Sequence, residues 1–103
     1  MTAQDTESTP VVFRVEKRGP FRDEITAVFP TLPADVHGNN MICYAHIGQH
    51  GSCSWGWYCK TRAARSEEYA DLLRELESIG YRVDVKCRIS AAMRAQLRRE
   101  VRS

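Results

Sequence analysis

The side chains best suited to chemistry are concentrated in residues 41–60, which hold both tryptophans and three of the four cysteines. Cysteines and histidines follow one another here as C-x2-H-x3-H-x2-C-x5-C, and zinc takes four such ligands. The candidate metal ligands are Cys43, His46, His50, Cys53 and Cys59. The C-x2-C pair typical of structural zinc sites is missing, and on a strand Cys43 and His46 point to opposite faces. We therefore expect no cofactor, with zinc binding as the alternative.

The same stretch gives little support for catalysis. A cysteine beside His46 or His50 would supply a nucleophile and a base. An imidazole also needs an acid to orient it, and no acidic residue lies between Asp35 and Glu67 in the sequence. The expectation is a non-enzymatic protein with no catalytic residues.

The segment HIGQHG lacks the Gly-Lys-Ser/Thr of a phosphate-binding loop. Its glycines instead suit a tight chain reversal, in which the polar side chains satisfy backbone groups. The predicted structural motif comprises His46, Gly48, Gln49, His50 and Gly51. Residues 48–56 as a whole are rich in glycine and serine, so a loop is predicted there.

Two features favour a binding protein. A Trp-Gly-Trp-Tyr run in a loop resembles the aromatic anchors of protein interfaces. Residues 86–103 carry six basic side chains against one acidic one, which suits an acidic protein surface or phosphate. The candidate partner-binding residues are Trp55, Trp57, Tyr58, Arg94, Arg98, Arg99 and Arg102. A protein partner or self-association is expected first; the alternative is a nucleic-acid-binding module that uses the basic C-terminal helix and aromatic stacking.

These side chains must be positioned by a small α+β domain. Apolar alternation bounded by Gly, Pro and Asn predicts strands at residues 11–17, 23–30, 41–47, 57–61 and 81–89. Gly19-Pro20 joins the first two strands as a hairpin. Residues 30–40 are predicted to be a loop, because two prolines interrupt regular pairing.

Two helices are predicted. Residues 66–79 follow a good capping residue, Ser66, and end at Gly80, which suits a left-handed terminus. The apolar stripe of this main amphipathic helix is Tyr69, Leu72, Leu73, Leu76 and Ile79. A basic helix at residues 91–101 has a narrower stripe of Met93, Leu97 and Val101. The predicted fold is an antiparallel sheet of three to five strands with the main helix packed on one face.

Length and composition set the remaining bounds. A chain of 103 residues with 43% hydrophobic and 27% charged residues is typical of one globular domain. We expect a disordered tail at 1–10, one α+β domain at 11–90 and the basic helix at 91–103. No apolar run approaches the length of a membrane span, and no signal peptide is visible. The predicted location is therefore the cytoplasm, with reduced cysteines.

The chain also resembles a known group of sequences. Phe29-Pro30, the HIGQHG segment and the run EEYADLLRELESIGYRVDV at 67–85 are similar to a family of small uncharacterised bacterial, phage and mobile-element proteins. Their signature is H-[VI]-G-Q-H-G followed by EEYxxLxxELxxIGY, and the likeness covers residues 11–90. The family has no established activity, so the resemblance implies an accessory protein, of which an inhibitor of a host complex is one kind. The cysteine- and tryptophan-rich loop and the arginine-rich end depart from the family pattern.

Overall fold

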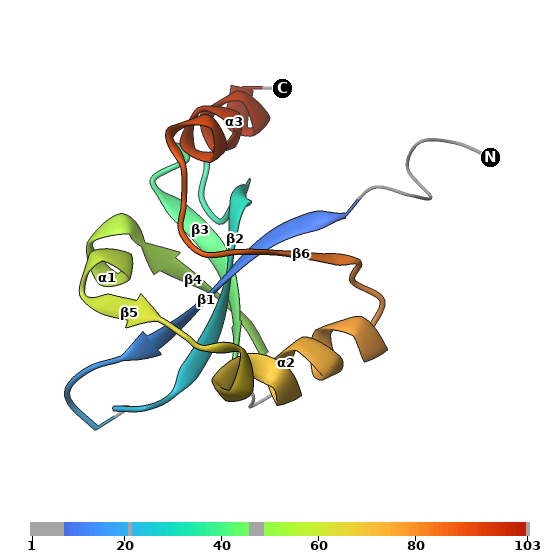
Figure 1. Cartoon of the computed structure of the whole chain (residues 1–103). Coiled ribbons are helices and arrows are strands. Elements are labelled where there is room, and N and C mark those ends of the chain that lie inside the picture. The colour runs from blue at the N-terminus through green and yellow to red at the C-terminus, as the bar shows by residue number, and fades with distance from the viewer. Residues whose placement is uncertain (1–7, 21, 46–48, 103) are drawn as a thin grey trace.

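The fold is a mixed α+β structure built on one six-stranded sheet. It is seen in a computed structural model, which describes residues 8–20, 22–45 and 49–102 (Figure 1). Three helices accompany the sheet in these ranges. The expected α+β class with an antiparallel sheet is confirmed, and the sheet has more strands than expected. No helix in the described ranges is long and apolar enough to cross a membrane.

The sheet follows the order β4-β3-β2-β1-β5, and every pair along this path is antiparallel. The strands are β1 (Thr9–Glu16), β2 (Ile25–Pro33), β3 (Asn40–Ala45), β4 (Gln49–Ser54), β5 (Thr61–Ala63) and β6 (Val83–Lys86). The outer edge of β1 is shared. Its first half pairs in parallel with β6, from Thr9 opposite Val83, and its second half pairs with β5, from Arg14 opposite Ala63.

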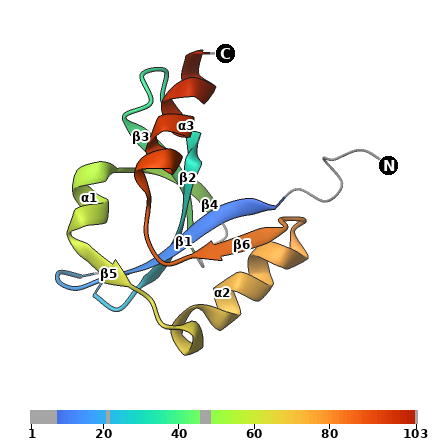
Figure 2. The ribbon, with the colours of Figure 1, turned by 45° about the horizontal axis from the view of Figure 1, so that its top comes forward.

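One face of the sheet is covered by α2 (Ser66–Ser78) (Figure 2). Leu72 and Leu76 are fully buried there, and burying each stabilises the fold by roughly 1.5–3 kcal/mol. The buried cluster on this face comprises Val11, Phe13, Ala27, Phe29, Tyr44, Leu72 and Leu76. Ile79 was expected in the apolar stripe but is half exposed, because it lies past the last helical residue.

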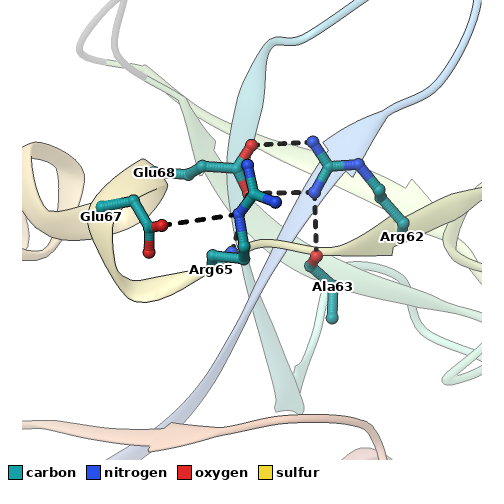
Figure 3. A network of polar contacts seen from close by, with 5 residues as sticks. All are labelled: Arg62, Ala63, Arg65, Glu67 and Glu68. Carbon is teal, nitrogen blue, oxygen red and sulfur yellow. Dashed lines mark hydrogen bonds and ion pairs between the residues drawn. The ribbon is translucent and has the colours of Figure 1, made fainter.

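The start of α2 differs from the prediction by one residue. Arg65, not Ser66, is the capping position, and its backbone N–H donates to Glu68 Oε1 at 2.8 Å. Glu68 also accepts two hydrogen bonds from the Arg62 guanidinium, at 2.9 and 2.7 Å (Figure 3). The helix is followed by Gly80 at φ +112°, a conformation that glycine adopts without strain.

The other face of the sheet is covered by α1 (Trp55–Cys59) and α3 (Ala91–Arg102) (Figure 2). Leu97 of α3 is buried and Met93 packs beside it, so α3 is docked on the sheet. The buried cluster on this face comprises Val12, Val28, Met41, Cys53, Tyr58, Ile89 and Leu97.

The loop predicted at residues 48–56 is wrong for residues 49–56, and Gly48 lies outside the described residues. Residues 49–54 form β4, which pairs with β3 from Asn40 opposite Ser54 to Ala45 opposite Gln49. Strand β3 would otherwise present an unpaired edge, and this non-local requirement overrides the low strand propensity of glycine and serine.

The short strand expected at residues 57–61 is also wrong. Residues 55–59 are helical, and the Ser54 side chain caps this helix by accepting from Trp57 N–H at 3.0 Å. The chain returns to the sheet only afterwards, as β5.

Two further strands differ in extent. The loop expected from residue 30 is wrong at its start, because β2 continues through two prolines to Pro33 with a register shift after Phe29.

The strand expected at 81–89 is shorter, and its apolar side chains do not all lie on one face of the sheet. Val83 packs on the α2 side, whereas Ile89 is buried on the α3 side, so the chain crosses the sheet edge after β6.

Candidate functional site

The aromatic segment and the basic helix meet on one surface. The Arg94 guanidinium carbon lies 4.0 Å from the centre of the Trp55 ring, and Trp55 stacks on Tyr58 at 4.9 Å. Arg14 from β1 lies over Tyr58 at 4.3 Å. These four side chains form a cation–aromatic stack that links α3, α1 and the sheet. A cation over an aromatic ring contributes about 0.5–1 kcal/mol at an exposed site and more when desolvated.

Hydrogen bonds fix the inner half of this stack. The Tyr58 hydroxyl accepts from the backbone N–H of Ile89 at 3.0 Å, immediately before α3. The Tyr58 carbonyl accepts from the Thr61 hydroxyl at 2.7 Å. Arg14 donates to that hydroxyl and to the Thr61 carbonyl, at 2.9 and 2.6 Å. Tyr58 therefore holds the chain leading into α3 against the sheet.

A cavity of about 370 Å³ opens between α1, α3 and the turn at residues 34–40. It is lined by His37, Gly38, Asn39, Asn40, Met41, Ser54, Trp55, Gly56, Arg94, Leu97 and Arg98. None of these residues is acidic. Within the described ranges, the guanidinium groups of Arg94 and Arg98 have no hydrogen bond or ion pair with protein. We call this space the α1–α3 cavity.

The turn at one side of the cavity is stabilised by hydrogen bonds within the turn itself. Asp35 Oδ1 accepts from the backbone N–H of Asn39 at 2.9 Å and from that of Asn40 at 3.4 Å. Gly38 adopts φ +71° against Val101 of α3. Asp35, two residues from His37 in the sequence, is thus used inside the turn and does not line the cavity.

The three aromatic residues predicted to bind a partner do not share one surface. Trp55 is half-buried and lines the α1–α3 cavity. Tyr58 is buried, so its side chain is not available to contact a second protein. Trp57 is half-buried, and its ring N–H donates to Glu16 Oε1 at 2.6 Å. It faces a second cavity of about 470 Å³, lined by Glu16, Lys17, Arg18, Trp57, Lys60 and Thr61. The loop predicted for these aromatic residues is therefore wrong: Trp55, Trp57 and Tyr58 lie on helix α1, which packs on the sheet.

The arginines of α3 also separate. Arg94 and Arg98 line the α1–α3 cavity, and Arg99 is exposed without lining it. The side chain of Arg102 lies outside the described part of the chain. Of the candidate arginines whose side chains are described, Arg94 and Arg98 line this cavity together with Trp55.

The candidate metal ligands do not converge where they are described. Cys43 and Cys53 share the α3 side of the sheet, Cys59 is exposed on α1, and His46 lies outside the described residues. His50 belongs to the α2 side, with its Nε2 2.8 Å from the Tyr81 hydroxyl oxygen. Over residues 8–20, 22–45 and 49–102, no three Cys, His, Asp or Glu side chains gather as a metal site.

The predicted structural turn of HIGQHG is wrong for its second half. Residues 49–51 belong to β4, where His50 lies opposite Tyr44 and Gly51 lies opposite Cys43. Gly48, like His46, lies outside the described residues, and so does the side chain of Gln49. His50 bonds to a tyrosine side chain instead of to turn backbone.

Each face of the sheet also carries side-chain contacts from residues that the sequence did not single out. On the α2 side, the Tyr44 hydroxyl donates to Glu75 at 2.5 Å, and this carboxylate raises the pKa of Tyr44. On the α1–α3 side, the Arg14 guanidinium is held by Tyr58 and Thr61, and strand alternation alone does not reveal that a helix covers that face.

No protein-family model, curated protein or solved structure matches this chain. The resemblance to small bacterial and mobile-element proteins therefore stays a prediction, and the argument for function depends on the α1–α3 cavity.

Proposed function

We propose that this chain is a small non-enzymatic binding protein whose α1–α3 cavity takes an acidic segment of a protein partner. The observation that carries this proposal is the pair of guanidinium groups, Arg94 and Arg98, in a concave site without a lining acid. Arginine presents its donors as a planar fork that matches a carboxylate. A glutamate or aspartate side chain entering the cavity would supply the missing counter-charge.

The Arg94 side chain is preorganised for binding. Its guanidinium rests on Trp55, which in turn rests on the buried Tyr58. A side chain already held in place loses less conformational entropy when it binds, and this loss is otherwise about 0.5–1.5 kcal/mol per side chain. Trp55 therefore acts as a platform for a cation, and a partner would contact it mainly through Arg94.

The same contacts weigh against single-stranded nucleic acid as the ligand. Such binders stack bases on available aromatic faces. Here the ring of Trp55 already carries Arg94 and packs on Tyr58, and Tyr58 is buried. Trp57 does not line the α1–α3 cavity, and its ring N–H donates to the Glu16 carboxylate. In the setting that the sequence resemblance implies, an accessory protein of a phage or mobile element would use this cavity to bind and inhibit a host complex.

Binding of labelled anions tests the proposal. An oligoglutamate peptide and an oligothymidylate of equal length are titrated separately with the protein at physiological salt, and fluorescence anisotropy is recorded. The double variant Arg94→Gln with Arg98→Gln should weaken peptide binding about tenfold or more, because tenfold corresponds to 1.4 kcal/mol and charge-assisted bonds contribute about 1.5–3 kcal/mol each.

The matched control is Arg22→Gln with Arg82→Gln, since both side chains are exposed and neither lines the cavity. It removes the same charge and should leave peptide affinity within about twofold of the wild type, well below the tenfold that 1.4 kcal/mol represents. Tighter binding of the oligothymidylate than of the peptide, or equal losses in the two double variants, would show that the cavity does not recognise an acidic protein segment.

A further inference from the structure

A pair of thiols lies on the α3 side of the sheet, and neither thiol lines the α1–α3 cavity. Cys43 on β3 lies opposite Gly51, and Cys53 on β4 lies opposite Met41. Cys43 and Cys53 are therefore diagonal neighbours on the same face of an antiparallel pair. Both are reduced, and they lie close enough for each thiol to shift the pKa of the other.

The two sulfurs differ in access. Cys53 is buried, with 7% of its surface exposed, whereas Cys43 is half-buried. The position opposite Cys43 is a glycine, and a Cβ built there would lie 3.7 Å from the Cys43 sulfur. Any larger side chain at residue 51 would extend over that sulfur, so Gly51 leaves Cys43 as the reachable member of the pair.

The two thiols also differ in acidity. The neighbouring Cys53 thiol and the backbone N–H of Gly51 stabilise a thiolate on Cys43 and lower the pKa of Cys43 to about 7 despite its burial. The neighbouring Cys43 and burial raise the pKa of Cys53. A thiolate is the reactive form of cysteine, so the accessible thiol is also the nucleophilic one.

We infer that Cys43 and Cys53 form a modification site for low-molecular-weight disulfides, in which Cys43 attacks first and Cys53 resolves the product. The Cys43 thiolate attacks one sulfur of R–S–S–R, forming a mixed disulfide and releasing RS⁻. Cys53 then loses its proton to solvent and attacks the Cys43 sulfur. This step releases the second RS⁻ and leaves a Cys43–Cys53 disulfide, and the two electrons lost by the protein thiols reside on the two released thiolates.

Closing this disulfide requires a small movement. Diagonal neighbours in an antiparallel pair are about 7–8 Å apart, and disulfides join Cα atoms about 4.4–6.8 Å apart. An approach on the order of 1 Å is therefore needed. Strand β4 is the last strand on its side of the sheet and pairs only with β3 among the described strands, so it can move without breaking a second ladder.

The test uses the full chain carrying Cys59→Ser and Cys87→Ser, because both of these cysteines are exposed and would react on their own. Dithiobis(nitrobenzoate) serves as the disulfide. The thiol pair should release two equivalents of thionitrobenzoate and retain no adduct by mass spectrometry. Adding Cys53→Ala should reduce the release to one equivalent and leave a stable adduct on Cys43, whereas adding Cys43→Ala should leave a slowly reacting protein.

A retained adduct when both thiols are present, release only after unfolding, or equally fast reaction of the Cys43→Ala protein would overturn the proposal. A measurement on the unaltered chain covers the case in which a variant does not fold. Brief alkylation followed by fragment-ion mapping should label Cys43 ahead of Cys53, and the reverse order contradicts the assignment of roles. None of these outcomes depends on the proposed acidic partner.

Discussion

Removing one oxygen atom, in Tyr58→Phe, should loosen α3 without disturbing the cation–aromatic stack. The Tyr58 hydroxyl is the acceptor for the buried backbone N–H of Ile89, at 3.0 Å. Phenylalanine keeps the ring that contacts Trp55 and Arg14. The substitution therefore isolates the hydrogen bond that anchors the entry to α3.

The expected loss of unfolding free energy follows from the Ile89 N–H that the substitution leaves without an acceptor. Tyr58 is 7% exposed and Ile89 8% exposed, so the orphaned N–H has poor access to water. A buried donor without an acceptor costs about 1–3 kcal/mol. Each kcal/mol lowers the melting temperature of a domain of this size by about 4–8 °C.

Thermal and urea unfolding followed by circular dichroism measure this loss, and amide hydrogen exchange should show faster exchange at Ile89. The control is Tyr69→Phe. Tyr69 also stacks on a ring, that of Phe13 at 4.4 Å, but its hydroxyl has no protein hydrogen bond in the described ranges. The control should stay within about 0.5 kcal/mol of the wild type. A Tyr58→Phe protein as stable as the control would refute the role of this bond.

Two other substitutions test the turn against α3 and the cap of α2. Gly38→Ala should destabilise more than Gly19→Ala in urea titrations, because both residues have positive φ but only at Gly38 would a Cβ meet Val101, at 3.0 Å; equal losses would contradict the contact. For the cap, hydrogen bonds from Arg62 hold the pKa of Glu68 at about 2, below its ordinary value of 4.5. The depressed pKa means that ionised Glu68 stabilises the fold above pH 4.5 and that this contribution is lost as the pH falls toward 2. Melting temperatures of Glu68→Gln should therefore lie below the wild type at neutral pH and converge with it in acid, and a constant difference would refute the linkage.

The elements that the sequence predicts well are those whose pattern is local. Leucines spaced along one helical face and a glycine after the last turn indicate α2 before any tertiary contact is known. The hairpin of β1 and β2 is similarly local, because alternation and a Gly-Pro turn lie next to each other in the chain.

The misassigned elements depend on non-local pairing. Strand β4 has a composition that is poor for strands, and it is extended because β3 pairs with it. Helix α1 has five residues, too few to be stable alone, and is held by the Ser54 cap and by packing of Tyr58 on the sheet. Neither the pairing of β4 with β3 nor the packing of α1 on the sheet can be read from a short segment of sequence.

The candidate site was predicted in parts but not as a whole. Trp55, Arg94 and Arg98 were each identified by residue type, since aromatic and arginine side chains dominate interfaces. Their convergence arises only when α3 docks beside α1, on the face where Ile89 and Leu97 are buried. Arg14 was not singled out, because alternation does not reveal that both faces of the sheet are covered.

The most direct test of the α1–α3 cavity is to observe its arginines while the oligoglutamate peptide is added. Nitrogen-15 NMR resolves the side-chain Nε–Hε groups, and the Arg22→Gln/Arg82→Gln protein serves as the titration control. We expect the Arg94 and Arg98 signals to shift together with the peptide concentration and to follow the same saturation curve as the anisotropy measurement. Saturable binding that leaves both signals in place and moves those of other arginines would contradict the assignment of this cavity as the binding site.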